Sequence, residues 1–289
     1  MPSRLIAECA ADLVSCGSIE MSAHLADART LGGLLPAGTK VYVNHLPRHT
    51  LADTLAALQA VHAAGLEPVP HVAARRVASR EELDEYLTRA VRSAGVRKVL
   101  LIGGDDPQPL GAFEDSTALL KSGALAACGV REISIAGYPE GHARIPQAAL
   151  ERAMGEKLAI AKAQGLGVHV VTQFSFAPAR VIEYCTALAR NAPGEPVYVG
   201  LAGPADPVTL LRFAQRCGVS ASLRALRAQG MGLVRLVTHT DPGEQLTSVA
   251  RYCSTHDNCN VVGVHLFSFG GAAKTAQWMN GVIAQQRAA

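Results

Sequence analysis

Short apolar runs rich in β-branched residues alternate along the chain with longer segments in which apolar residues recur every three or four positions. The short runs predict eight strands, over residues 17–21, 40–44, 68–72, 98–103, 132–136, 167–173, 196–201 and 260–267. Most of these runs are continuously apolar, which is typical of parallel strands buried on both faces. We therefore expect a parallel sheet covered by helices.

Capping signals bound the helices between these strands. Side chains that can cap an amino terminus precede helical patterns at Thr50, Ser79 and Asp206, and Ser79 has a glutamate, Glu82, three positions later. Glycines end the patterns at positions 65, 95, 165 and 218. The Ala-rich segment 146–164 is also predicted to be helical.

The alternation of eight strands with helices favours a (β/α)8 TIM barrel, an α/β fold that typically takes about 250 residues. We interpret residues 1–289 as one such domain, with the first 16 residues as a leading helix. The competing fold is an open doubly wound sheet, whose first strand usually runs into a G-x-G-x-x-G phosphate loop. Here the first strand ends in Ser18-Ile19-Glu20-Met21, and no such loop follows.

Composition narrows the classes of function. Of the 289 residues 49% are hydrophobic and 18% are charged, which predicts a folded core. Lys and Arg (27) nearly balance Asp and Glu (24) without a basic block, which argues against nucleic-acid binding. No apolar stretch approaches the roughly 18 residues of a membrane span. The seven cysteines include no C-x-x-C pair, so we expect small buried thiols in a reducing cytoplasm.

Hydrogen-bonding or titratable residues stand at the ends of the predicted strands. They are Glu20, Asn44, His45, His71, Asp105, Tyr138, Glu140, His142, Gln173 and Ser268. Each alone is compatible with a solvated rim. In a TIM barrel, however, the active site gathers at the carboxyl ends of the strands, so their coincidence predicts a ligand pocket there.

Glu20 is the most informative of these residues. Its apolar neighbours predict a partly desolvated carboxyl, and desolvation raises a carboxyl pKa and favours a general acid, although a glutamate paired with Lys or Arg is the alternative. Gly104 before Asp105 allows close approach of the backbone to a ligand, but a turn without a ligand has the same sequence. The ten histidines show no metal-binding spacing, so we expect no metal.

Five stretches stand out at or near the ends of the predicted strands, namely IEM at 19–21, PHV at 70–72, LIGGD at 101–105, IAGYPEGH at 135–142 and VTQFSF at 171–176. In this order they resemble the methylenetetrahydrofolate reductase family. Membership implies a TIM barrel that reduces 5,10-methylenetetrahydrofolate to 5-methyltetrahydrofolate, normally through FAD that NAD(P)H reduces. It also implies a place in one-carbon metabolism and methionine biosynthesis.

The resemblance implies roles for single residues. Glu20 matches the acid that opens the five-membered ring of the folate, and Asp105 matches an aspartate near the flavin and the pterin. We assign Gln173, Phe176 and Asp105 to folate binding. The residues assigned to cofactor binding are Asn44, His71, Gly104, Tyr138 and His142.

Two departures from the family pattern concern FAD. Gly103 stands where the family has the arginine of Arg-Gly-Asp, and the basic pair before the sixth strand is reduced to Lys162. Each such group normally supplies a charge-assisted hydrogen bond of about 1.5–3 kcal/mol. Two routes therefore stay open. FAD binds through altered contacts, or it is weakly held or absent and NADH or NADPH gives hydride directly to the folate.

Two other functions also stay open at this point. A pterin-binding methyltransferase barrel would pass a methyl group to a corrinoid partner without nicotinamide, and a non-catalytic barrel would bind folate as a sensor. The sequence leaves undecided whether NADH or NADPH is used, in which direction the reaction runs, and whether the chain forms a homo-oligomer.

Overall fold

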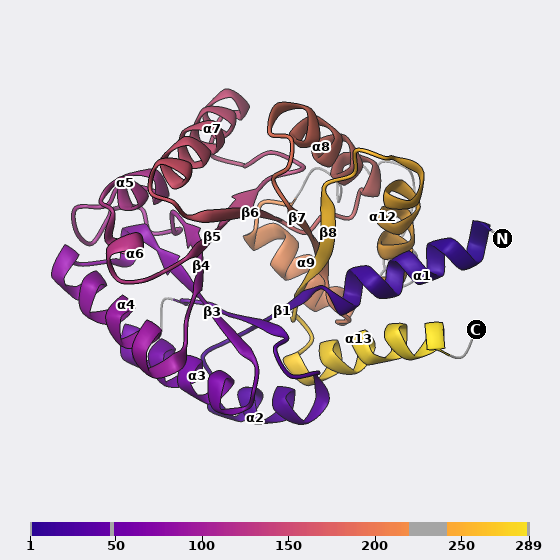
Figure 1. The fold of residues 1–289 in the computed structure, drawn as a ribbon, viewed down its shortest axis with the longest axis horizontal. Coiled ribbons are helices and arrows are strands. Elements are labelled where there is room, and N and C mark those ends of the chain that lie inside the picture. Colours follow the sequence, from indigo (N-terminus) through magenta and orange to yellow (C-terminus); the bar gives the residue numbers. More distant parts are fainter. Residues whose placement is uncertain (1, 47–48, 220–241, 288–289) are drawn as a thin grey trace. The chain divides into compact units, whose positions relative to one another are not determined.

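The chain folds as a (β/α)8 TIM barrel, as the sequence predicts. The computed structural model describes residues 2–46, 49–219 and 242–287. Its parallel strands close into a barrel in the order β1-β2-β3-β4-β5-β6-β7-β8, with helices between them along the chain (Figure 1). Strand order therefore follows chain order, which is the topology that repeated βα units produce.

All eight predicted strands are present, and each of their ends lies within one residue of the prediction. The strands are β1 (Ser18–Met21), β2 (Lys40–Val43), β3 (Glu67–Ala73), β4 (Lys98–Ile102), β5 (Glu132–Gly137), β6 (Gly167–Thr172), β7 (Val197–Ala202) and β8 (Val261–Phe267). Their apolar side chains are mostly buried, which explains why continuous apolar runs located them so closely.

Helices follow the strands at the expected places. They are α1 (Pro2–Ser15), α2 (Leu25–Leu34), α3 (Leu51–Ala63), α4 (Arg80–Ala94), α5 (Ser116–Lys121), α6 (Ala124–Ala127), α7 (Gln147–Ala163), α8 (Pro178–Asn191), α9 (Pro207–Arg216), α12 (Gly243–Thr255) and α13 (Ala272–Arg287), with a 3-10 turn, η1, at Ala74–Arg76. Helix α1 is the predicted leading helix.

The predicted caps explain where three helices begin. Thr50 and Asp53 form a reciprocal capping box at α3, and Asp206 accepts from the Thr209 amide at α9. The box predicted at α4 is only half formed. Ser79 accepts from the Glu82 amide, but the Glu82 carboxylate accepts from the Ala78 amide instead of from Ser79.

Contacts divide the chain into two compact units. The first unit comprises residues 1–19, 137–146 and 171–289, and the second comprises residues 20–136 and 147–170. The interpretation of the whole chain as a single domain stays a prediction.

In the second unit, β2, β3, β4 and β5 pair in parallel, and α3 packs against both α2 and α4 (Figure 1). Lys98 on β4 lies between two carboxylates, with Nζ at 3.2 Å from Glu67 on β3 and 3.3 Å from Glu132 on β5. Glu132 is also the residue that pairs with Lys98 in the register of β4 and β5.

A polar triad is buried inside the second unit. The hydroxyl of Tyr42 on β2 lies 3.0 Å from both Ser134 Oγ on β5 and His169 Nε2 on β6, and Ser134 Oγ is 2.7 Å from the same ring nitrogen. All three residues are buried. Each polar group thus has partners, as buried polar groups require.

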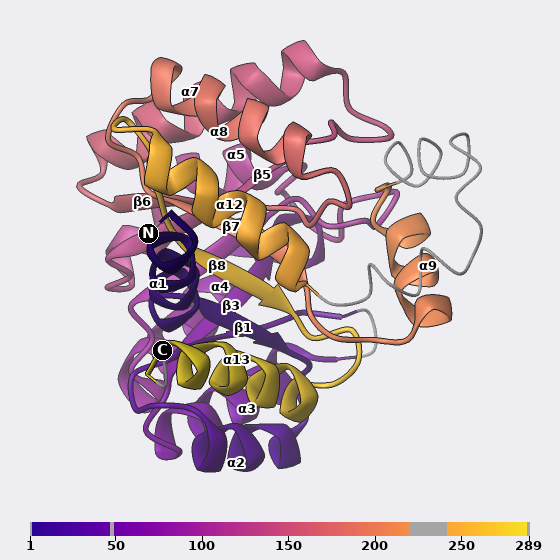
Figure 2. The same ribbon diagram turned by 90° about the vertical axis from the view of Figure 1, so that its right-hand side faces the viewer.

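In the first unit, α1 packs against both α12 and α13, although most of the chain separates α1 from these two helices in sequence (Figure 2). Strand β8 pairs with β1 and with β7. Ser18 Oγ on β1 and His265 Nδ1 on β8 are 2.9 Å apart in the buried interior. Gly200 on β7 allows a close approach, since a Cβ there would lie 2.1 Å from the Thr172 carbonyl oxygen.

The cysteines differ from the expectation of small buried thiols. All seven are free, but only Cys185 is buried, Cys16 is exposed, and the other five are half-buried. The prediction failed because cysteine was read by its usual preference for cores rather than by its position on each helix. Among the helices that the structure describes, none is long and apolar enough to cross a membrane.

Candidate active site

Three predicted site residues of the second unit meet around the Glu20 carboxylate. Glu20 is the third residue of β1, and its side chain is 15% exposed. Asn44 Nδ2 donates to Glu20 Oε1 over 3.2 Å, and His71 Nε2 lies 3.6 Å from Glu20 Oε2. Three neighbouring strands therefore each contribute one side chain to this group.

The local backbone explains this meeting. Asn44 comes directly after β2, and its amide donates to the Met21 carbonyl at the end of β1, over 3.0 Å. His71 lies within β3, and its side chain is 8% exposed. The Tyr42 ring meets the His71 ring edge-on, with 6.1 Å between the ring centroids. The basic side chain that the structure shows next to the Glu20 carboxylate is thus that of a histidine.

The arrangement is suited to proton transfer. A carboxyl that keeps some contact with solvent can reach a bound molecule, while the Asn44 amide N–H holds one of its oxygens and the His71 imidazole faces the other. The imidazole can also return a proton to the carboxylate. Glu20, Asn44 and His71 are hereafter called the Glu20 group.

Asp105 lies on a loop that two arginines hold. It is exposed and follows Gly104, whose φ is +93°. The next residue, Asp106, pairs with Arg76, with Nε and Oδ2 at 2.7 Å, and Arg75 Nη1 donates to the Asp106 carbonyl over 2.9 Å. The predicted Gly-Gly-Asp-Asp turn is therefore a fixed loop.

Sequence reasoning missed both arginines. Their signal is a basic pair directly after β3, in the 3-10 turn η1, opposite two aspartates in the following strand-end loop. Arg76 also donates to the carbonyl of His45 over 3.2 Å. Burial lowers the pKa of His45 below its ordinary 6.5, and the positive charge of Arg76 lowers it further.

The remaining predicted site residues lie in the first unit. Ser268 directly follows β8, and the others lie at the ends of β5 and β6. Tyr138 directly follows β5, and its ring contacts His142 edge-on at 5.3 Å. Gln173 directly follows β6, and its backbone N–H donates to the Gly137 carbonyl over 2.8 Å. Its side-chain oxygen accepts from the backbone N–H of Phe174. Ser175 donates to the Glu140 carboxylate over 2.6 Å, which joins the two strand-end segments.

Phenylalanine rings gather beside Gln173. Five of the six phenylalanines of the chain take part, namely Phe174, Phe176, Phe213, Phe267 and Phe269. Phe174 is buried at the centre, whereas Phe176 is only half-buried. Only Phe176 was predicted as a site residue. Phe174 follows β6 like Phe176, whereas the other three come from β8, α9 and the segment after β8, and nothing local in the sequence indicates that these three converge on it.

The two positions at which the family pattern has basic side chains, 103 and 162, differ in their surroundings. A Cβ added at Gly103 would meet nothing within 4 Å, so the missing side chain leaves open space. Lys162 is exposed in the last turn of α7. Lys157, also on α7, is buried, its ammonium donates to Ser116 Oγ over 3.3 Å, and burial lowers its pKa.

Comparison with known proteins places the chain in a family. A family model described as methylenetetrahydrofolate reductase matches residues 45–222, more than half of the chain. Glu20 and Asn44 lie before the matched segment, so their assignment depends on their motif and on the contacts described above.

Solved structures with similar folds include two dihydropteroate synthases. One, from Yersinia pestis and bound to a pterine-sulfa conjugate, is 12% identical, with 96% of this chain and 95% of that chain covered and a TM-score of 0.49. The other, from Thermus thermophilus, is 16% identical, with 94% and 93% covered and a TM-score of 0.48. An oxaloacetate acetylhydrolase is 12% identical, with 99% and 85% covered and a TM-score of 0.49.

Proposed function

Because this chain belongs to the methylenetetrahydrofolate reductase family, we propose that it interconverts 5,10-methylenetetrahydrofolate and 5-methyltetrahydrofolate with NAD(P)H. The observation that carries the proposal is the Glu20 group, in which one carboxyl is held by Asn44 and faces His71. The family match supports a folate-related TIM-barrel enzyme, and the Glu20 group supplies the acid that this reaction needs.

Glu20 acts as the general acid in this proposal. Its carboxyl gives a proton to the N10 nitrogen of the folate, and the bond between that nitrogen and the bridging carbon breaks. The electron pair of the N5 nitrogen then forms an iminium with this carbon. Hydride adds to the carbon and gives the 5-methyl group, while NAD(P)H becomes NAD(P)+. The carboxylate that remains lies 3.6 Å from His71 Nε2, a route by which it can be protonated again.

Gln173, Phe176 and Asp105 are proposed to bind the folate. A carboxamide offers both a donor and an acceptor, which suits the edge of a pterin ring. Phe176 is the half-buried edge of the phenylalanine cluster and supplies an apolar surface beside Gln173. Asp105 is exposed on a loop that Arg75 and Arg76 fix through Asp106, so its carboxylate is presented without a large entropic cost.

The residues at positions 103 and 162, where the family pattern has basic side chains, do not fit a flavin diphosphate. Gly103 carries no side chain, and Lys162 is exposed at the end of a helix. Nearby cations have other partners, since Arg75 and Arg76 hold the Asp106 loop. These observations favour direct hydride transfer from NADH or NADPH. We propose that this nucleotide is bound by Gly104, Tyr138 and His142. Asn44 and His71, which also contact Glu20, are proposed to bind it as well.

An absorbance spectrum and an assay test the proposal together. The pure protein is expected to lack a stoichiometric flavin band and to oxidise NAD(P)H only when methylenetetrahydrofolate is present. A flavin band in the active protein, with activity lost when the flavin is removed, would establish the FAD route instead. Methyl transfer without nicotinamide would favour the methyltransferase alternative, and folate binding without turnover would favour a sensor.

Glu20→Gln tests the acid. The amide keeps the shape of the side chain but has no acidic proton, so kcat/KM is expected to fall by roughly 100- to 10,000-fold, the usual contribution of general acid catalysis. Glu85→Gln, which changes an exposed glutamate on α4, is the matched control and should keep the activity of the unmodified protein. Full activity of Glu20→Gln would contradict the mechanism.

A further inference from the structure

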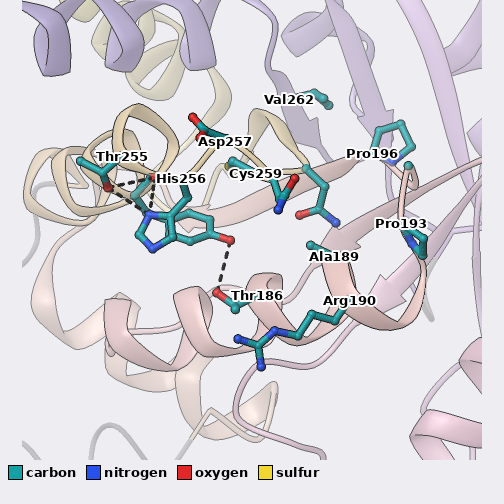
Figure 3. A pocket seen from close by; sticks show the side chains of 14 residues that line it. Thr186, Ala189, Arg190, Pro193, Pro196, Thr255, His256, Asp257, Cys259 and Val262 are labelled. Carbon is teal, nitrogen blue, oxygen red and sulfur yellow. Dashed lines mark hydrogen bonds between the residues drawn. The ribbon is translucent and has the colours of Figure 1, made fainter.

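An open cleft of about 910 Å³ lies in the first unit, and none of the predicted site residues of this unit lines it. It is lined by the last part of α8 and by the segment that joins α12 to β8. Figure 3 shows Thr255, His256 and Cys259 on one side of the cleft and Arg190 and Pro193 on the other. One of the lining residues is thus a thiol.

A second thiol, that of Cys253, contacts the thiol of Cys259. Cys253 stands in the last turn of α12, and its Sγ is 3.2 Å from Sγ of Cys259, with which it shares a hydrogen bond. The chain turns between them, because the Cys259 amide donates to the His256 carbonyl over 3.0 Å. Both cysteines are half-buried, and the turn between them is exposed. The two sulfur atoms can therefore approach bonding distance through a small movement of the turn.

The surroundings favour a thiolate at Cys259. The hydrogen bond between the two thiol groups lowers the pKa of Cys259 to about 7, and the Val261 amide and the charge of His256 lower it further. Near pH 7 a larger fraction of this thiol is therefore ionised than of an ordinary cysteine. By contrast, burial raises the pKa of nearby Cys185 to about 12, which makes that thiol unreactive.

A metal is not the reason for this pairing in the part of the chain that the structure describes. Within it, no three side chains of His, Cys, Asp or Glu come together in a way that could hold an ion. Two thiols in contact, one of them on an open cleft, fit a different chemistry, namely reversible oxidation.

We propose that Cys253 and Cys259 form a redox-active dithiol that a hydroperoxide entering the cleft oxidises to a disulfide. In the first step the Cys259 thiolate attacks the peroxide, so that its sulfur becomes a sulfenic acid and one alcohol or water molecule leaves with a proton. In the second step the Cys253 sulfur attacks the sulfenic sulfur. The disulfide forms, and one water molecule leaves with the Cys253 proton. The sulfur atoms lose two electrons, and the peroxide gains them.

Mass spectrometry of the protein treated with hydrogen peroxide tests this proposal. Trypsin releases residues 252–274 as one peptide, because no Lys or Arg lies between Arg251 and Lys274. This peptide is expected to lose about 2 Da and to resist thiol alkylation, and a reducing agent should restore both thiols.

Two variants separate the roles of the thiols. Cys253→Ser is expected to stop at the sulfenic acid of Cys259, which dimedone traps, and Cys259→Ser is expected to leave Cys253 unmodified. Cys16→Ser, which removes the exposed cysteine of the chain, is the matched control and should not change oxidation of the peptide. Circular dichroism checks that each variant folds.

Three results would overturn the proposal. Residues 252–274 could keep two alkylatable thiols while Cys16 is oxidised. The Cys259→Ser variant could react as fast as the unmodified protein. A disulfide could form that joins either thiol to Cys9 or Cys185 instead. None of these readouts depends on folate or NAD(P)H, so the outcome is independent of the proposed reductase activity.

Discussion

Asn44 holds Glu20 by a hydrogen bond of 3.2 Å, from an amide directly after β2 to a carboxyl within β1. If Asn44 positions the acid, Asn44→Ala should lower kcat by about tenfold, the worth of one hydrogen bond to a charged group. The KM for NAD(P)H should rise as well, because Asn44 is also proposed to contact the nucleotide. Steady-state kinetics with each substrate varied in turn measures both. A rise in KM for NAD(P)H at constant kcat would instead assign Asn44 to the nucleotide alone.

Gly103→Arg should increase the affinity for FAD. The Cβ of the new residue meets nothing within 4 Å, and its guanidinium restores the charge that the family pattern places there. One charge-assisted hydrogen bond of about 1.5–3 kcal/mol corresponds to roughly a 10- to 100-fold tighter dissociation constant. Titration of the protein with FAD, followed by flavin fluorescence, gives this constant.

Gly33→Arg is the matched control for that experiment. It adds the same charge on α2, where a Cβ also has open space. Its affinity for FAD should equal that of the unmodified protein. Equal gains in both variants would mean that general charge, and not position 103, determines flavin binding.

The stability of the protein should fall as the pH drops through the titration of His45. Burial lowers the pKa of this histidine below 6.5 in the folded state, so the unfolded chain takes up the proton first. The free energy of unfolding is therefore unaffected by His45 above pH 6.5. It decreases as the pH falls from 6.5 toward the folded-state pKa. Urea unfolding at a series of pH values measures this decrease.

His45→Gln should make that decrease smaller, because the variant has no proton to bind at this position. An identical pH dependence in the His45→Gln variant and the unmodified protein would show that other groups cause it.

The buried triad of Tyr42, Ser134 and His169 should contribute measurably to stability. Tyr42→Phe removes the hydroxyl but keeps the ring, and the 2.7 Å contact between Ser134 and His169 can remain. The free energy of unfolding is expected to fall by about 1–2 kcal/mol. Combining Tyr42→Phe with Ser134→Ala should cost less than the sum of the single changes, because the two hydroxyls share one network. Additive costs from urea unfolding would argue against coupling.

The elements that the sequence predicts well are those whose signal is local. A strand such as β4 is a continuous apolar run, and helix α3 begins at a residue whose side chain caps it, so each can be recognised from its own residues. Closure of the barrel follows from repetition of such units. The strand-end positions of Glu20, Gln173 and Tyr138 follow in turn, because the end of a run is visible in the sequence.

Partnerships between distant side chains could not be predicted in this way. The pair of Arg76 and Asp106 joins loops after two different strands, and long side chains choose partners that periodicity does not indicate. The contact of Cys253 with Cys259 needs a turn between a helix and a strand, and a six-residue spacing is not a known motif. In each case the sequence shows the residues, and only the fold shows which ones meet.

Lys98 also bears on how the strands find their alignment. Its ammonium lies between Glu67 and Glu132, so three adjacent strands are joined through one side chain. Because side chains alternate between the two faces of a strand, a slip of β4 by one residue would turn this ammonium to the opposite face and separate it from both carboxylates at once. Misaligned pairing of β4 with β3 or with β5 would thus lose an ion pair of the same lysine. The observed alignment of these three strands is favoured over the slipped one.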